Sequence, residues 1–238
     1  TIATFGDTVH TFVQRQGYSG VFHPFYHPLE GQQPARSLGL TEIDHLGISI
    51  EAGTLQTWVE YYRQVFGFLL VHQEHVVTAN SAMHSSVVQD PSGTVKFPMQ
   101  EPAPARGMSQ IEEFLGAYHG SGVQHLALST QDILTTIRAL RKSGIEFLST
   151  PDSYYNYEML ESRVGSIEED INELRRQHIL VDRDEWGYLL QIFSKPVQSR
   201  PTLFLEVIQR RDARGFGSGN IRALFEAVER DQALRGNL

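Results

Sequence analysis

Two histidines, His45 and His125, stand 80 residues apart in similar short segments. In residues 43–48 (IDHLGI) and 123–128 (VQHLAL), an apolar and a polar residue precede the histidine, and mainly apolar or small residues follow it. A single histidine on a strand is more often a hydrogen-bonded core residue. Two at equivalent positions of related units would face each other across a pseudo-twofold axis, and imidazole is the commonest metal ligand. The pair therefore indicates a shared metal site.

A third ligand is predicted at Glu206. Residues 201–208 (PTLFLEVI) place this one carboxylate inside an otherwise apolar strand, 81 residues after His125. Burying an unpaired carboxylate is expensive, so Glu206 needs a cation, a proton or a surface position. Two imidazoles and one carboxylate form the facial triad typical of non-haem Fe(II) oxygenases. Catalytic zinc can use the same ligands, so the triad alone leaves both metals open.

Composition narrows the function further. The 238 residues include no cysteine, which excludes a disulfide scaffold, Cys-ligated zinc or iron–sulfur sites and a thiol nucleophile. The net charge of −8 repels phosphate backbones and argues against nucleic-acid binding. No apolar run is long enough for a membrane span, and no signal-peptide pattern opens the chain. We expect a cytoplasmic protein.

The elements that must position the triad form a repeat. Residues 55–66 and 133–140 carry apolar side chains at helical spacing, and each run ends near a glycine, Gly67 or Gly144. Strands are expected at 68–71, 85–88 and 94–97 in the first unit and at 145–148, 179–181, 188–193 and 203–208 in the second. Strand, helix and further strands at a period near 80 residues predict an α+β fold of two βαβββ units.

Three more helices are expected outside the repeat. Ser109 with Glu112, and Ser166 with Glu169, have the spacing of a capping box at the start of a helix. An amphipathic helix follows the glycine-rich residues 215–219 and is expected to act as a lid. Arg210 and Arg211 are interpreted as solvated, and His72 as a histidine without a partner.

Four motifs, in order, resemble the 4-hydroxyphenylpyruvate dioxygenase family, which includes the 4-hydroxymandelate synthases. They are residues 122–128 (GVQHLAL), 187–193 (GYLLQIF), 200–210 (RPTLFLEVIQR) and 215–220 (GFGSGN). The resemblance runs from about Gly6 to the C-terminus. It implies the vicinal-oxygen-chelate fold, an open half-barrel around a metal, with Fe(II) held by His45, His125 and Glu206.

The same resemblance implies further site residues. The polar ones expected around the substrate are Gln191, Gln124, Gln110 and Ser85, although a regular strand would point Gln124 away from His125. The apolar ones are Phe193, Phe204 and Phe216.

Two positions depart from the dioxygenase pattern. Gln100 stands in PMQEP where the dioxygenases usually have asparagine, and Ile221 follows Gly–Asn where they usually have phenylalanine. Both are expected to contact substrate. Mandelate-forming relatives tend to be aliphatic at the second position, which makes 4-hydroxymandelate the alternative product. The rest of the chain resembles the homogentisate-forming enzymes, so homogentisate is the expected main product.

The resemblance also sets the expected organisation. Residues 1–38 are interpreted as the tail of a largely absent N-terminal domain with its linker, and residues 39–238 as the catalytic domain. The chain starts at Thr1, which is interpreted as truncation. The expected partners are a small 2-oxo acid, O₂ and further copies of the chain. A zinc or nickel isomerase and a metal-free binding protein are the other classes considered for this fold.

Overall fold

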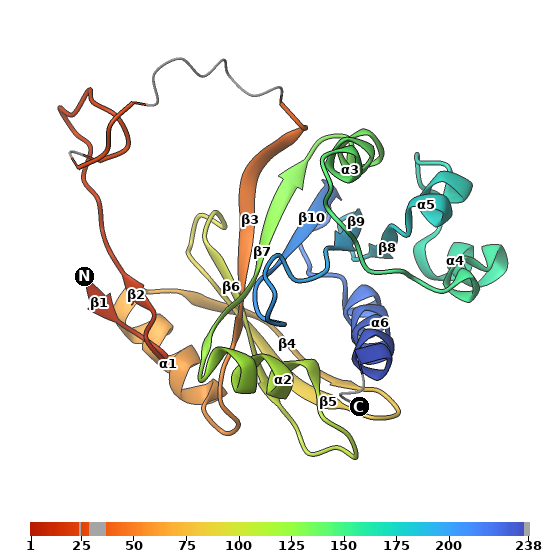
Figure 1. The fold of residues 1–238 in the computed structure, drawn as a ribbon, viewed down its shortest axis with the longest axis horizontal. Coiled ribbons are helices and arrows are strands. Elements are labelled where there is room, and N and C mark those ends of the chain that lie inside the picture. Colours follow the sequence, from red (N-terminus) through yellow and green to blue (C-terminus); the bar gives the residue numbers. More distant parts are fainter. Residues whose placement is uncertain (24, 29–36, 236–238) are drawn as a thin grey trace.

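The structure is a computed structural model that describes residues 1–23, 25–28 and 37–235 (Figure 1). Its main feature is one curved eight-stranded sheet in the order β4-β5-β6-β3-β7-β10-β9-β8. The first half comprises β3 (Leu40–Ser49), α1 (Leu55–Phe66), β4 (Leu69–Val77), β5 (Ala82–Gln89) and β6 (Lys96–Pro102). The second comprises β7 (Gly122–Thr130), α3 (Ile133–Lys142), β8 (Leu180–Arg183), β9 (Tyr188–Phe193) and β10 (Phe204–Arg211).

The two halves have the same topology, which confirms the predicted pair of βαβββ units. In each half the first strand lies parallel to the last, β3 to β6 and β7 to β10. The halves join through the antiparallel pair β3 and β7 at the centre of the sheet. The first strands of both units are therefore neighbours, and this arrangement brings the two repeated histidines together.

Further helices lie outside the repeat. They are α2 (Gln110–Tyr118), the 3₁₀ turn η1 (Asp152–Tyr155), α4 (Tyr157–Val164), α5 (Ile171–Gln177) and α6 (Ser218–Arg235). The C-terminal α6 contacts both edge strands, β4 and β8, and also α2. It therefore bridges the two ends of the half-barrel, as expected of a helix that closes its opening (Figure 1). None of the helices within the described residues is long and apolar enough to cross a membrane.

Local sequence signals account for several helix ends. Gly67 adopts a left-handed conformation (φ 69°) after α1, where its lack of a side chain removes the usual strain. Ser109 and Glu112 form the predicted capping box of α2. Two predictions in the second half are wrong. Residues 145–148 make one isolated bridge, Phe147 to Ser194, and α5 begins after Asp170 without a capping box at Ser166.

The N-terminal residues pack onto the first half. A short hairpin of β1 (Ile2–Ala3) and β2 (Val9–His10) precedes the sheet. Phe5 between its strands is fully buried and meets Trp58 of α1 edge to face, with ring centroids 5.5 Å apart. The sequence did not indicate this contact. The interpretation of residues 1–38 as a tail and linker stays a prediction.

Candidate metal centre

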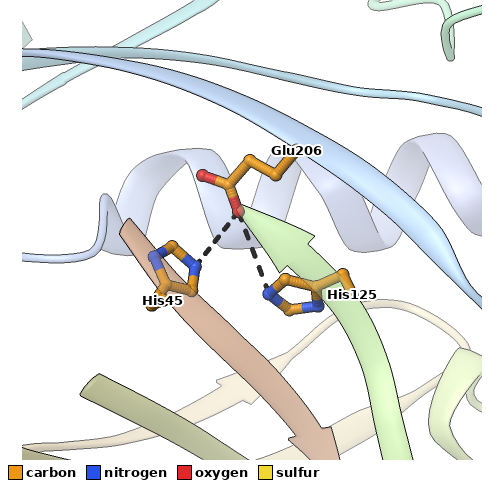
Figure 2. A group of neighbouring side chains, drawn as sticks. All are labelled: His45, His125 and Glu206. Atoms are coloured by element: carbon orange, nitrogen blue, oxygen red, sulfur yellow. Dashed lines mark ion pairs between the residues drawn. The ribbon is translucent and has the colours of Figure 1, made fainter. Parts of the chain in front are cut away.

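Three side chains from three adjacent strands meet on the concave side of the sheet. His45 comes from β3, His125 from β7 and Glu206 from β10, and all three are buried (Figure 2). The Nε2 atoms of His45 and His125 lie 3.3 Å and 3.8 Å from Oε2 of Glu206. Ligand atoms about 2.0–2.2 Å from one ion are about 3–4 Å apart. The three residues therefore fit one divalent metal ion, and their role as its ligands stays a prediction.

The glycine at position 47 makes this close approach feasible. Gly47 of β3 lies directly opposite His125 of β7, and a Cβ atom at Gly47 would fall 1.8 Å from Cε1 of that imidazole. The ring of His125 therefore occupies the space where any other residue would carry a side chain. The small residue two positions after each repeated histidine is the sequence signal for such an approach.

Each imidazole is held through its other ring nitrogen. Nδ1 of His45 donates to Oδ1 of Asp44 at 2.8 Å, and Nδ1 of His125 donates to Oε1 of Gln124 at 3.3 Å. Both rings consequently present Nε2 to Glu206. Outer hydrogen bonds of this kind fix the tautomer and direction of metal-binding histidines. Asp44 is a functional residue that the sequence analysis missed.

The charges at the centre also favour a cation. Burial opposes ionisation of Glu206, yet the imidazoles and the Gln191 amide outweigh it and hold the pKa of Glu206 below its usual range. Burial also lowers the pKa of His45, but the carboxylates of Glu206 and Asp44 more than offset this and raise it to about 9. For His125, burial dominates and lowers the pKa to about 4. Without metal at neutral pH, a proton on His45 partly balances the Glu206 carboxylate.

The small cavity beside the triad contains most of the expected substrate residues. It is lined by Ser85, Gln100, Gln191, Phe193, Phe216 and Ile221, and also by Leu224 and Phe225, which the sequence analysis did not assign. His72 lines it too and pairs with Glu74 at 3.0 Å, which corrects its interpretation as a histidine without a partner. Its free volume is about 30 Å³, enough for about two water molecules. An aromatic 2-oxo acid is much larger. Ile221, Leu224 and Phe225 of α6 form part of the wall of this cavity.

Three expected site residues do not line this cavity. Gln124 turns to the ring of His125, and Phe204 stacks on the same ring with centroids 5.0 Å apart. Gln110 is buried as the first residue of α2. In this structure Gln124 and Phe204 contact the ring of His125. Their direct contact with substrate stays a prediction, as does that of Gln110.

A chain of hydrogen bonds ties the centre to the start of α6. Nε2 of Gln191 donates to Oε1 of Glu206 at 2.8 Å, and Oε1 of Gln191 accepts from Nδ2 of Asn220 at 2.8 Å. The hydroxyl of Tyr154 donates to Oδ1 of Asn220 at 2.7 Å. Asn220 is fully buried. The amide of Gln191 is thereby fixed with its NH₂ group toward Glu206.

The fold and the centre together define the class. Residues 42–192 match the model of the Glyoxalase/Bleomycin resistance protein/Dioxygenase superfamily, and the chain belongs to this superfamily. Among curated proteins, the chain is 45% identical over 247 aligned residues to "Probable 4-hydroxyphenylpyruvate dioxygenase 2" of Aspergillus fumigatus. It is equally identical over 249 residues to 4-hydroxyphenylpyruvate dioxygenase of Caenorhabditis elegans. All of the chain is aligned in both cases, but it spans only 61% and 63% of the two relatives.

Solved structures show the same likeness. A triple mutant of 4-hydroxymandelate synthase from Streptomyces coelicolor is 42% identical with a TM-score of 0.74, over 82% of this chain and 55% of that one. A "xylose isomerase-like TIM barrel/4-hydroxyphenylpyruvate dioxygenase fusion protein" is 27% identical with a TM-score of 0.63, over 81% of this chain and 30% of that one. The expected vicinal-oxygen-chelate half-barrel is therefore confirmed.

Proposed function

We propose that this chain carries the Fe(II) centre of a dioxygenase that converts 4-hydroxyphenylpyruvate and O₂ to homogentisate and CO₂, a step of tyrosine catabolism. The main support is the buried triad His45, His125 and Glu206, in a chain 45% identical to proteins named for this activity. A ferrous ion would supply chelation of the 2-oxo acid and activation of O₂. Three protein ligands would leave room on such an ion for the substrate and O₂, as this chemistry needs.

The residues of the chain then bind and orient the substrate. Phe193 offers an aromatic face to the ring, while Gln100 and Ser85 offer neutral hydrogen-bonding groups for its oxygens. Gln191 would join them by releasing one of its present partners, Glu206, Phe216 or Asn220. Neutral amides suit this role because they add no charge beside the metal. Leu224 and Phe225 of α6 cover the cavity and exclude water, which protects a reactive oxidation from side reactions.

A second outcome of the same chemistry is 4-hydroxymandelate, with oxygen placed on the benzylic carbon. The observation that favours it is Ile221, which lines the cavity where the dioxygenases usually place phenylalanine. The likeness to 4-hydroxymandelate synthase points the same way. We keep homogentisate as the main product because the curated relatives carry the dioxygenase name.

The test is incubation of the purified chain with Fe(II), ascorbate, O₂ and 4-hydroxyphenylpyruvate, with products identified by chromatography and mass. Homogentisate as the main product supports the proposal. Equal turnover by Glu206→Ala would refute the assigned metal site. Activity with Zn²⁺ or Ni²⁺ and no O₂ uptake would instead indicate an isomerase. We further propose a cytoplasmic homo-oligomer acting on a small molecule, consistent with a net charge of −8 that disfavours nucleic acid.

A further inference from the structure

Arg210 contacts two parts of the molecule that have different tasks. Its side chain lies largely buried at the end of β10, although the sequence pattern favours a solvated arginine. On one side it meets Asp44, the partner of a metal-ligand histidine. On the other it meets the backbone of residues 213–215, which lead into α6. Burial of a charged group at such a junction requires an explanation.

The contact with Asp44 depends on an irregularity in β3. Ile43 pairs with Leu128 and His45 with Ala127, so Asp44 is one extra residue in the strand, a β-bulge. The bulge allows the carboxylate of Asp44 to reach the ring of its own neighbour, His45. Adjacent side chains on a regular strand point to opposite faces and could not make this bond.

The guanidinium of Arg210 holds that carboxylate with two parallel hydrogen bonds. Nε donates to Oδ2 of Asp44 at 2.7 Å, and Nη2 donates to Oδ1 at 2.8 Å. Oδ1 is also the atom that accepts from His45. Such a planar fork fixes orientation as well as charge, which an ammonium group cannot do. The direction of the His45 ring therefore depends on Arg210.

The third nitrogen of the same group binds the lid segment. Nη1 of Arg210 donates to the carbonyl of Gly215 at 2.6 Å and to that of Ala213 at 3.3 Å. The guanidinium also lies over the ring of Phe216, 5.6 Å from its centroid. The ring of Phe216 meets His45 edge to face with centroids 5.4 Å apart. The segment thus contacts the neighbourhood of the ligand twice, once through Arg210 and once directly.

We propose that Arg210 is a positioning residue that joins the metal ligand His45 to the lid segment, residues 213–220, so that metal binding and the closed form of that segment stabilise each other. This inference rests on the proposed function only in requiring a divalent metal at the triad. Because coupling between two events is reciprocal, loosening either end weakens the other. Asp44 transmits the effect, and neither residue touches the reacting atoms.

The test uses Co²⁺ alone as the probe, with the variants Arg210→Met and Arg210→Lys. Co²⁺ affinity is measured by titration of its visible absorption, and the lid segment is followed by hydrogen exchange with and without Co²⁺. Loss of a partner that orients a ligand costs about 10–100-fold in metal affinity. We expect this loss in both variants, because lysine keeps the charge but lacks the fork.

The matched control is Arg211→Met. Arg211 is the next residue of β10 and pairs with Glu168 and Glu169, remote from the triad. In the wild type and this control, Co²⁺ should slow exchange in residues 213–220. In both Arg210 variants at saturating Co²⁺, that added protection should be lost.

Each outcome decides the matter. A further variant, Asp44→Asn, removes the charge of the residue between Arg210 and His45. Wild-type Co²⁺ affinity in both Arg210→Lys and Asp44→Asn would show that Arg210 does not position His45 through Asp44. Unchanged metal-dependent protection of residues 213–220 would refute the proposed coupling to the lid segment. If Arg210→Met fails to fold, those two variants carry the test. A wild-type chain that binds no Co²⁺ at all would overturn the metal site itself, and this inference with it.

Discussion

The fit of the His125 ring over Gly47 can be tested by adding a single methyl group. In Gly47→Ala the new carbon would lie 1.8 Å from Cε1 and 2.1 Å from Nε2 of His125, where contact normally begins near 3.4 Å. The ring must therefore move by about 1.5 Å. Metal–nitrogen bonds near 2.0–2.1 Å tolerate only a few tenths of an ångström. The substitution should consequently remove His125 from the ligand set.

Two magnitudes follow from this displacement. Metal affinity should fall by more than about 100-fold, beyond the loss caused by removing an outer hydrogen-bond partner. Overpacking of the metal-free chain should cost about 1–3 kcal/mol of folding free energy. For a chain of this size that lowers Tm by about 2–4 °C per kcal/mol. Co²⁺ titration and thermal unfolding without metal measure the two effects separately.

The control is Gly116→Ala in α2. This glycine is exposed, and its added Cβ would have no atom within 4 Å. Alanine favours a helix over glycine by up to about 1 kcal/mol, so the variant should be as stable as the wild type or more stable, with normal Co²⁺ affinity. The clash itself is isolated by combining Gly47→Ala with His125→Ala, where the methyl group should cost little. Normal metal affinity in Gly47→Ala would refute this account of the site.

Three further predictions test protonation, product and lid. Because the pKa of His45 is raised to about 9 without metal while His125 is neutral, Co²⁺ binding at pH 7 should release about one proton, and Co²⁺ affinity should rise with pH toward 9. Calorimetry in two buffers counts the released proton. No release would contradict this assignment of charges. Ile221→Phe should lower any 4-hydroxymandelate fraction, since a ring stacked on two aromatic faces tilts less; an unchanged product ratio would exclude Ile221 as the selector. The buried carboxylate of Glu229 accepts hydrogen bonds from the hydroxyls of Thr78 and Ser81 and so holds α6 on the β4–β5 turn. Glu229→Ala should therefore hasten proteolysis within α6. Equal cleavage rates in the variant and the wild type would show that other contacts hold α6 in place.

The repeat made the fold predictable, because two similar units in one sequence are expected to pack symmetrically, with equivalent strands side by side. His45 and His125 occupy equivalent positions in the two units, and β3 and β7 are adjacent at the centre of the sheet. Glu206 could be predicted for a different reason: a single carboxylate in an apolar strand is costly to bury and so needs a partner. Each of these signals is local or periodic, and therefore readable without coordinates.

Features that depend on tertiary contacts could not be predicted from the sequence. Glu169 matches a capping-box position in sequence, but its carboxylate accepts from the Tyr188 hydroxyl and the Gln209 amide instead. The helix therefore begins after Asp170. Arg210 resembled a surface residue because its partner, Asp44, lies 166 positions earlier and reaches it only through a bulge. Neither spacing nor composition encodes such a pair.

The matching halves of the sheet have different tasks at the centre. In the second half, His125 on β7 and Glu206 on the parallel β10 both belong to the triad. In the first half, β3 gives His45, but β6, which lies beside β3 as β10 lies beside β7, presents Gln100 to the cavity. Gln100 pairs with Ser49, four residues after His45, whereas Glu206 pairs with Ala127, two residues after His125, so the two side chains do not occupy matching positions. The centre is therefore asymmetric: the second half supplies two of the three triad residues and the first half supplies one, while residues of both halves line the cavity.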